Sequence, residues 1–287
     1  MVRRALILGG GGVGGIAWLN GLLVEFWAHG FHPDKFELIA GTSAGASVAV
    51  QIASGLGPQE LFERQVDPAK QANELVPERA VLEKAAGVKA AIATLTDPAE
   101  IRRRRGAAAI SAATIPEADR RAVIASRLPV RVWPRAGLVL VSVDAESGEA
   151  AFFDQESGVD LVDAVTASSA VPGVWPPTTI NGRRYVDGAV RSPESTDLAK
   201  GFDRVLVISP VGENWPALPP RDLMADIEAL RGGGSQVILI QPDELARPAM
   251  GESLQELLDP ATREKAAHAG RAQALRILND VASIWAD

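Results

Sequence analysis

The chain has 287 residues, of which 47% are hydrophobic and 23% are charged, and it carries a formal net charge of −7. This is the composition of a globular protein with enough apolar material for a large core, and we expect a single domain over residues 1–287. The acidic balance argues against a nucleic-acid-binding protein, because such proteins normally carry a basic excess. The sequence has no cysteine, which excludes disulfides, thiolate metal sites and cysteine nucleophiles.

No segment has the pattern of a secretory signal or a membrane span. The apolar run that follows Arg3 and Arg4 stops after four residues at four consecutive glycines. A signal sequence needs a longer apolar region, and a spanning helix needs about 20 apolar residues. We expect a cytoplasmic protein whose contact with membranes is transient and peripheral.

The first fifty residues predict alternating strands and helices. Residues 4–8 predict a short buried strand, which runs into a glycine-rich loop at 9–15 and then into a helix. A second strand is predicted at 36–40, followed by a tight turn and a helix at 46–53. Alternation of this kind predicts an α/β fold with a mainly parallel sheet.

The segment from about residue 58 to 128 predicts a helical insertion. It is rich in Ala, Glu, Arg and Lys, and it contains no convincing strand. Thr114 is predicted to cap a helix with Pro116 in its first turn. Beyond the insertion, the sequence predicts a long C-terminal helix at 260–285 and strands at 137–143, 150–153, 184–186, 204–208 and 236–240.

A candidate nucleophile lies between the second strand and the helix after it. The sequence Gly41-Thr-Ser43-Ala-Gly45 matches the nucleophile elbow, in which the serine occupies a strained turn and small neighbours let the backbone fold tightly. The following helix directs its N-terminus at the site, where it favours developing negative charge. The same pattern also describes an ordinary glycine-bounded turn.

The first glycine loop has two interpretations. The spacing of Gly10, Gly12 and Gly15 fits a dinucleotide-binding turn. Such a turn requires an acidic residue at the end of the second strand to bind the ribose. Asp34 and Glu37 lie at or before the start of that strand instead. The alternative is an oxyanion hole, in which backbone N–H groups point at a carbonyl oxygen. Adjacent parallel strands would bring the loop beside Ser43, which favours an oxyanion hole formed by Gly10, Gly11, Gly12 and Val13.

A candidate base follows a later strand, in the sequence Asp187-Gly188-Ala189. An Asp-Gly pair at a strand end is also a common turn former. The preceding segment, residues 167–177, runs from a small-residue helix end into a proline-rich turn that contains Trp175.

In this order, the glycine loop, the elbow and the Asp-Gly-Ala motif resemble the patatin-like phospholipase family, over residues 4–56 and 137–210. The resemblance implies a three-layer α/β/α fold and hydrolysis of carboxylic esters, with lipids as the substrate class. It also implies that Ser43 is the nucleophile and Asp187 its base, with no metal or cofactor. Two positions depart from the family: Gly14 replaces its usual Arg or Lys, and Ala189 replaces its more frequent Gly.

The chain offers three histidines as alternative bases for the serine. His29 and His32 flank the end of the first helix, and the order Ser43, Asp187, His268 matches an α/β-hydrolase triad. A hydrolase elbow normally follows several strands, however, and His268 lies in a helical pattern. The sequence therefore favours a Ser-Asp dyad, with the triad as the alternative.

Several further questions stay open at this stage. Transacylation to another alcohol is a competing enzymatic function, and nucleotide binding by the glycine loop alone is a non-enzymatic one. Part of the 58–128 segment is either a mobile cover over the site or a fixed scaffold. The run 102–105, four arginines, is interpreted as a solvated helix end rather than a headgroup site. Ser168 and Ser169 lack elbow context and receive no role.

Overall fold

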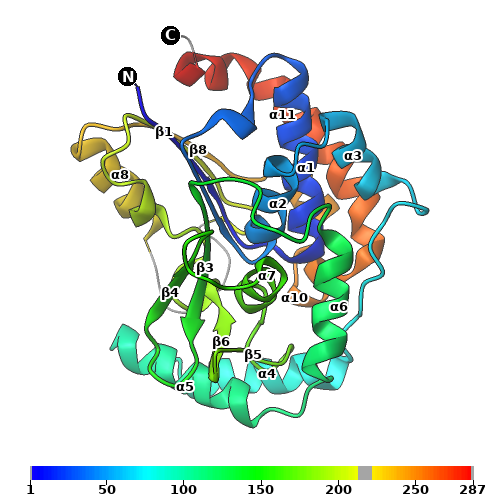
Figure 1. Cartoon of the computed structure of the whole chain (residues 1–287), viewed down its shortest axis with the longest axis vertical. Helices are drawn as coiled ribbons and strands as arrows, with labels where there is room; N and C mark the ends of the chain where they lie inside the picture. Colours follow the sequence, from blue (N-terminus) through cyan, green and yellow to red (C-terminus); the bar gives the residue numbers. More distant parts are fainter. Residues whose placement is uncertain (1, 213–221, 286–287) are drawn as a thin grey trace.

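A central mixed sheet organises the chain in the computed structural model, which describes residues 2–212 and 222–285 (Figure 1). Strands β1, β2, β3, β7 and β8 pair in parallel, and β4, β5 and β6 add antiparallel pairings at one end. Hydrogen-bonded neighbours follow the order β5 (Thr178–Ile180), β6 (Arg183–Asp187), β3 (Leu138–Asp144), β2 (Leu38–Thr42), β1 (Arg4–Leu8), β7 (Arg204–Ile208) and β8 (Gln236–Ile240), with β4 (Ala150–Phe153) also paired to β3.

Helices cover both faces of the sheet. Along β1, Leu6 and Leu8 pack into the core that contains α1 (Gly12–Ala28), α2 (Ala44–Ala53) and α11 (Arg263–Trp285). Ala5 and Ile7 pack on the opposite face with α8 (Leu223–Gly232). Because side chains alternate along a strand, β1 contributes to both cores, and its apolar residues are buried on either side. The predicted three-layer α/β/α fold is confirmed (Figure 1).

The predicted helical insertion is also present. It contains α3 (Pro58–Val66), α4 (Arg79–Ala91), α5 (Pro98–Ser111) and α6 (Glu117–Arg127). Helices α4 and α5 lie at the end of the molecule where β5 and β6 are found (Figure 1). The remaining elements are α7 (Leu161–Ser168), α9 (Ala246–Met250), α10 (Leu254–Leu258) and the short 3₁₀ turns Pro33–Lys35, Gly188–Val190, Thr196–Ala199 and Pro260–Thr262.

Strands β2 and β6 meet end to end along one edge of β3. Val141 pairs with Thr42 of β2, and Ser142 pairs with Asp187 of β6. Strand β4 pairs with both of these β3 residues, so it occupies the other edge, and β2 and β6 must share the first. The carboxyl ends of two strands that run in opposite directions therefore meet at the middle of β3.

Some predicted boundaries were wrong. The first helix begins at Gly12 rather than after Gly15, and the second strand is Leu38–Thr42 rather than 36–40. Thr114 is not a helix cap, because α6 begins at Glu117 with Pro116 at its N-cap position. The short strand β5 was not predicted.

Within residues 2–212 and 222–285, the structure contains no helix long and apolar enough to cross a membrane.

Candidate active site

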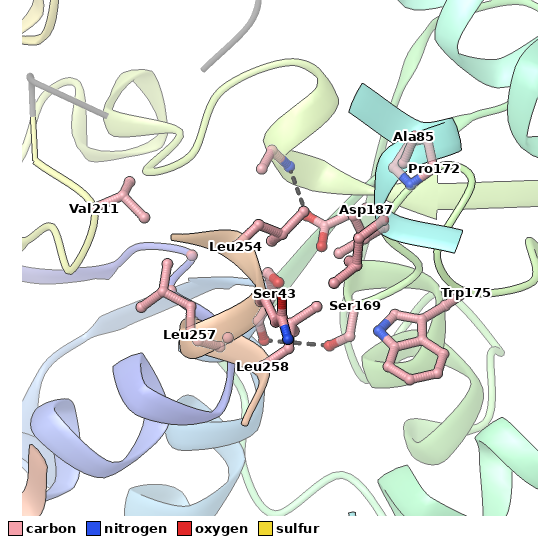
Figure 2. A pocket seen from close by; sticks show the side chains of 18 of the residues that line it. Ser43, Ala85, Ser169, Pro172, Trp175, Asp187, Val211, Leu254, Leu257 and Leu258 are labelled. Atoms are coloured by element: carbon pink, nitrogen blue, oxygen red, sulfur yellow. Dashed lines mark hydrogen bonds between the residues drawn. The ribbon is translucent and has the colours of Figure 1, made fainter. Parts of the chain in front are cut away.

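A cavity of about 830 Å³ lies where β1, β2 and β6 end, and both Ser43 and Asp187 line it (Figure 2). Helix α10 contributes Leu254, Leu257 and Leu258 to its wall, and α4 contributes Leu82. Carboxyl ends of parallel strands are where α/β sheets leave their ligand crevice. The sequence-predicted nucleophile and base are thus in one largely apolar cavity.

Ser43 occupies a strained turn between β2 and α2. Its φ of 56° lies in the left-handed region, which a non-glycine residue adopts only when the surroundings hold it there. The flanking glycines permit the turn: a Cβ on Gly45 would lie 2.0 Å from the carbonyl oxygen of Leu8, and one on Gly41 would lie 2.5 Å from that of Gly45. This is the backbone geometry of a nucleophile elbow.

Two serines from the end of α7 fix the elbow. The hydroxyl of Ser168 accepts a hydrogen bond of 3.0 Å from the Ser43 N–H and donates one of 2.6 Å to the carbonyl of Val141. The hydroxyl of Ser169 donates to the Ser43 carbonyl at 3.3 Å (Figure 2). No role was predicted for these serines, because their bonds to Ser43 reach across more than a hundred residues and leave no local pattern.

Asp187 is buried, with 3% of its surface exposed. Its carboxylate accepts a hydrogen bond of 2.8 Å from the Ala189 N–H, and it also accepts one from the Ser43 side chain. Burial raises the pKa of Asp187 to about 6, although these hydrogen bonds and the guanidinium groups of Arg105 and Arg120 oppose the rise. A carboxylate of this pKa is a better base than a solvated one at neutral pH.

Gly188 and Ala189 hold Asp187 in place. A Cβ on Gly188 would lie 2.5 Å from the Val141 carbonyl oxygen, so only glycine lets the chain pass this close to β3. Ala189 supplies the N–H that binds the carboxylate, and it lines the cavity. Both motif residues are therefore in contact with the site.

The glycine loop reaches the cavity beside Ser43. A Cβ on Gly10 would lie 3.5 Å from the Cβ of Ser43, and Gly10, Gly11 and Gly12 all line the cavity. The Gly10 N–H already donates to the Pro193 carbonyl at 3.0 Å. Helix α1 begins at Gly12, so the N–H groups of its first turn have no intrahelical acceptor.

These observations narrow the candidates for an oxyanion hole. Gly11 and Gly12 line the cavity, whereas Val13 is not among the residues that do. Gly15 supports the loop by bonding the Gly11 carbonyl at 2.8 Å. Ala44, which lines the cavity at the start of α2, is a further candidate donor, since the residue after the nucleophile commonly serves in elbows. The elbow motif itself could have indicated Ala44.

None of the three histidines lines the cavity. His268 lies on α11, with its ring centroid 5.3 Å from that of Phe62. The side chains of His29 and His32 are 44% and 50% exposed. The structure thus brings together Ser43 and Asp187 but not the histidine of the alternative triad.

Four arginines line the cavity: Arg79 of α4, Arg105 of α5, and Arg120 and Arg127 of α6. The position of Arg105 corrects the interpretation of the 102–105 run as a solvated helix end. Arg103 and Arg104 are exposed and pair with Glu100, but Arg105 is partly buried and faces the site. No feature of the sequence marked Arg120 as a site residue, because an arginine in a charged helical segment normally faces solvent.

In the part of the chain that the structure describes, no three His, Asp or Glu side chains gather where they could hold a metal ion.

A sequence model of the patatin-like phospholipase family matches residues 6–200, more than half of the chain. The chain belongs to the patatin-like phospholipase family. Members of this family are lipid acyl hydrolases. Among curated proteins, none matches the chain.

Two solved structures are similar to this patatin-like chain. VipD from Legionella pneumophila is 14% identical with a TM-score of 0.49, and the match covers 97% of this chain and 67% of VipD. The type III effector protein ExoU is 15% identical with a TM-score of 0.39, and the match covers 96% of this chain and 53% of ExoU.

The departure of this patatin-like chain at Gly14 has a steric basis. A Cβ at this position would lie 2.3 Å from the carbonyl oxygen of Met250, in α9. Helix α9 therefore packs where a larger side chain would begin. The other departure, Ala189, keeps the N–H that binds Asp187.

Proposed function

We propose that the protein is a serine acyl hydrolase that cleaves carboxylic ester bonds of lipids, of the phospholipase A or lipid acyl hydrolase type. The observation that carries the proposal is the pairing of a strained elbow serine, Ser43, with a buried carboxylate, Asp187, that it hydrogen-bonds. Membership of the patatin-like phospholipase family supports lipids as the substrate class.

In the first half-reaction, Asp187 accepts the Ser43 hydroxyl proton as the oxygen attacks the ester carbonyl carbon. The carbonyl oxygen becomes an oxyanion, which the N–H groups of Gly11, Gly12 and Ala44 and the N-terminus of α2 stabilise. The intermediate then collapses: the carbon–oxygen bond to the leaving alcohol breaks, and Asp187 returns the proton to that oxygen. The acyl group is left on Ser43.

In the second half-reaction, Asp187 takes a proton from water, which attacks the acyl carbonyl carbon. The bond to Ser43 breaks, the proton returns to the serine oxygen, and a fatty acid leaves. The apolar cavity wall from α4 and α10 gives the acyl chain a place to bind. The proposed reaction needs no metal or cofactor, and its substrate is reached by transient contact of a cytoplasmic, single-domain protein with a lipid surface.

The test is hydrolysis of a panel of acyl esters by the wild type, Ser43→Ala, Asp187→Asn and the double variant. Each single variant should lose at least about a thousandfold in kcat/KM. The double variant should be little worse than either, because the two groups act as one unit. Losses that multiply would contradict the dyad.

Ser47→Ala is the matched control. Ser47 lies one turn further along α2, is fully buried, and has a hydroxyl with no hydrogen-bond partner. Its removal changes the same helix without touching the cavity, and we expect wild-type activity. A wild type inactive on every ester in the panel would contradict the proposed function.

A further inference from the structure

A group of buried charges lies under the cavity wall formed by α5 and α6. The side chain of Glu74 is 1% exposed and binds two arginines, the Nη2 of Arg127 at 2.6 Å and the Nη2 of Arg263 at 2.7 Å. One carboxylate therefore pairs with two guanidinium groups. This leaves the Glu74 cluster with one net positive charge.

Arg120 lies beside this cluster and is 2% exposed. Its guanidinium carbon is 4.1 Å from the centroid of the Trp175 ring, and its Nε and Nη1 atoms have no hydrogen-bond partner. A guanidinium directs its N–H groups outward in its own plane. Stacking on Trp175 occupies one face of the group, and Arg120 also lines the cavity.

Among the residues that the structure describes, the acids that act on Arg120 do not balance the positive charge. Glu74 and Asp187 are the carboxylates whose fields act on it, and Arg127 is the cation that does so. Counting Arg263, which also pairs with Glu74, these described groups are three arginines and two carboxylates, a net charge of +1. Burying unbalanced charge is costly, and burial together with Arg127 lowers the pKa of Arg120 to about 9.

We propose that Arg120 binds the phosphate group of a glycerophospholipid substrate. The inference rests on the proposed function and names its substrate class: a phosphodiester-bearing acyl ester rather than a neutral glyceride. Arg120 acts electrostatically on Asp187, so an anion bound to it lies near the reacting ester. In a glycerophospholipid the phosphate is a few bonds from the nearest ester carbonyl, and planar guanidinium groups suit its oxygens.

The first experiment compares the kcat/KM of dihexanoylphosphatidylcholine with that of dihexanoylglycerol at pH 8.5, for the wild type and Arg120→Met. Loss of a charged hydrogen bond should reduce hydrolysis of the phospholipid by about 10- to 100-fold more than that of the glyceride. Some loss on both substrates is expected, because removing Arg120 also removes a cation that favours the Asp187 carboxylate. Equal losses on the two substrates in a folded variant would overturn the proposal.

Arg121→Met is the matched control. Arg121 is the next residue of α6, but it is exposed and pairs with Asp160 and Asp163. Its removal should leave the ratio of the two substrates unchanged. Arg120→Met should also keep or raise the Tm without ligand, because it removes an unbalanced buried charge, whereas an arginine with a purely structural role would lower it. If Arg120→Met does not fold, Arg120→Lys keeps the charge without the planar fork and should still reduce the ratio.

A binding experiment separates failure of this subsite from failure of the proposed function. In the Ser43→Ala background, dihexanoylphosphatidylcholine below its micelle concentration should raise the Tm more than dihexanoylglycerol does, and Arg120→Met should abolish that difference. This holds even if the wild type hydrolyses no ester. Hexanoate giving the same stabilisation would assign Arg120 to a product carboxylate and would overturn the proposal.

Discussion

Thr42 and Asp187 pair with consecutive residues of β3, Val141 and Ser142, although they end two strands that run in opposite directions. The register brings Ser43, the residue after Thr42, to the carboxyl end of β6. Because β3 pairs with both strands, the geometry of the site depends on a buried hydrogen-bond ladder rather than on a loop. Positions fixed on sheet strands vary less than positions on loops, which suits the proposed Ser43–Asp187 dyad.

The pH dependence of catalysis should follow Asp187. Burial raises the pKa of this carboxyl to about 6, and only the carboxylate can accept the serine proton. We expect kcat/KM to rise with pH through about 6 and to level off above it. A less polar co-solvent should move the inflection upward, because ionisation of a neutral carboxylic acid creates charge, whereas a histidinium would respond little. A profile with its inflection near pH 4, or one that ignores the co-solvent, would contradict Asp187 as the base.

The same pKa predicts a stability gain in Asp187→Asn. The folded pKa of about 6 lies above the unfolded value of about 3.9, so the native state loses stability as the pH rises through 6. At pH 8 the ionised carboxylate costs about 3 kcal/mol, which Asp187→Asn should recover in urea unfolding. The gain should shrink towards zero as the pH falls to 4.

Asp144→Asn provides the control with the opposite sign. Burial would raise the pKa of Asp144, but hydrogen bonds from the N–H groups of Ser147 and Glu146 outweigh it and lower the pKa. Removing this charge should destabilise the protein at pH 8. If Asp187→Asn also loses stability at pH 8, the assignment of Asp187 as a buried carboxylate with a raised pKa is contradicted.

Two glycines of the first loop should respond differently to alanine. A methyl on Gly10 would make an ordinary contact with Ser43 at 3.5 Å, so Gly10→Ala should fold normally but crowd the reacting carbonyl and lower kcat/KM by about tenfold or more. A methyl on Gly14 would lie 2.3 Å from the Met250 carbonyl oxygen, so Gly14→Ala should lose about 1–3 kcal/mol of stability. Thermal melts and ester assays of both variants check this. A Gly10→Ala variant that is destabilised but keeps its activity, beside a stable Gly14→Ala variant with low activity, would contradict the placement of the loop at the site.

Helix α4 should become protected when the site is occupied. Leu82 and Val88 of this helix line the cavity, yet none of its described side chains is buried. Elements with little buried surface open at low free energy. We expect the α4 amides to exchange more slowly once a long-chain alkylphosphonate is attached to Ser43, with α1 as the unchanged reference. Equal exchange in both states would leave α4 as a fixed scaffold.

The fold and the motif residues were predictable because their signals are local. Apolar runs, the glycine loop and the elbow each depend on residues close together in sequence, and a strand must lead into Ser43 for that motif to work. The start of α1 was not predicted, since Gly12, Gly14 and Gly15 are poor helix formers, and packing against α9 and α10 rather than propensity places them in a helix.

The arginines and covering elements of the site were not predictable, because their positions depend on residues that are far apart in the sequence. Arg120 is buried by Trp175, in a segment more than fifty residues away, and its neighbour Glu74 comes from before α4. Two apolar residues of the helical insertion, Leu75 and Val76, are exposed. Such placements depend on long-range packing, which leaves no periodic trace in the sequence.

The most direct test of the central claim is the mass of the intact protein after reaction with a fluorophosphonate probe. We predict one adduct on Ser43 in the wild type, formed at a similar rate in His268→Ala, since His268 packs against Phe62 outside the cavity. Ser43→Ala should carry none, and Asp187→Asn should react at least about a thousandfold more slowly. Labelling of Ser43→Ala, or loss of labelling in a folded His268→Ala variant, would contradict a Ser43–Asp187 dyad.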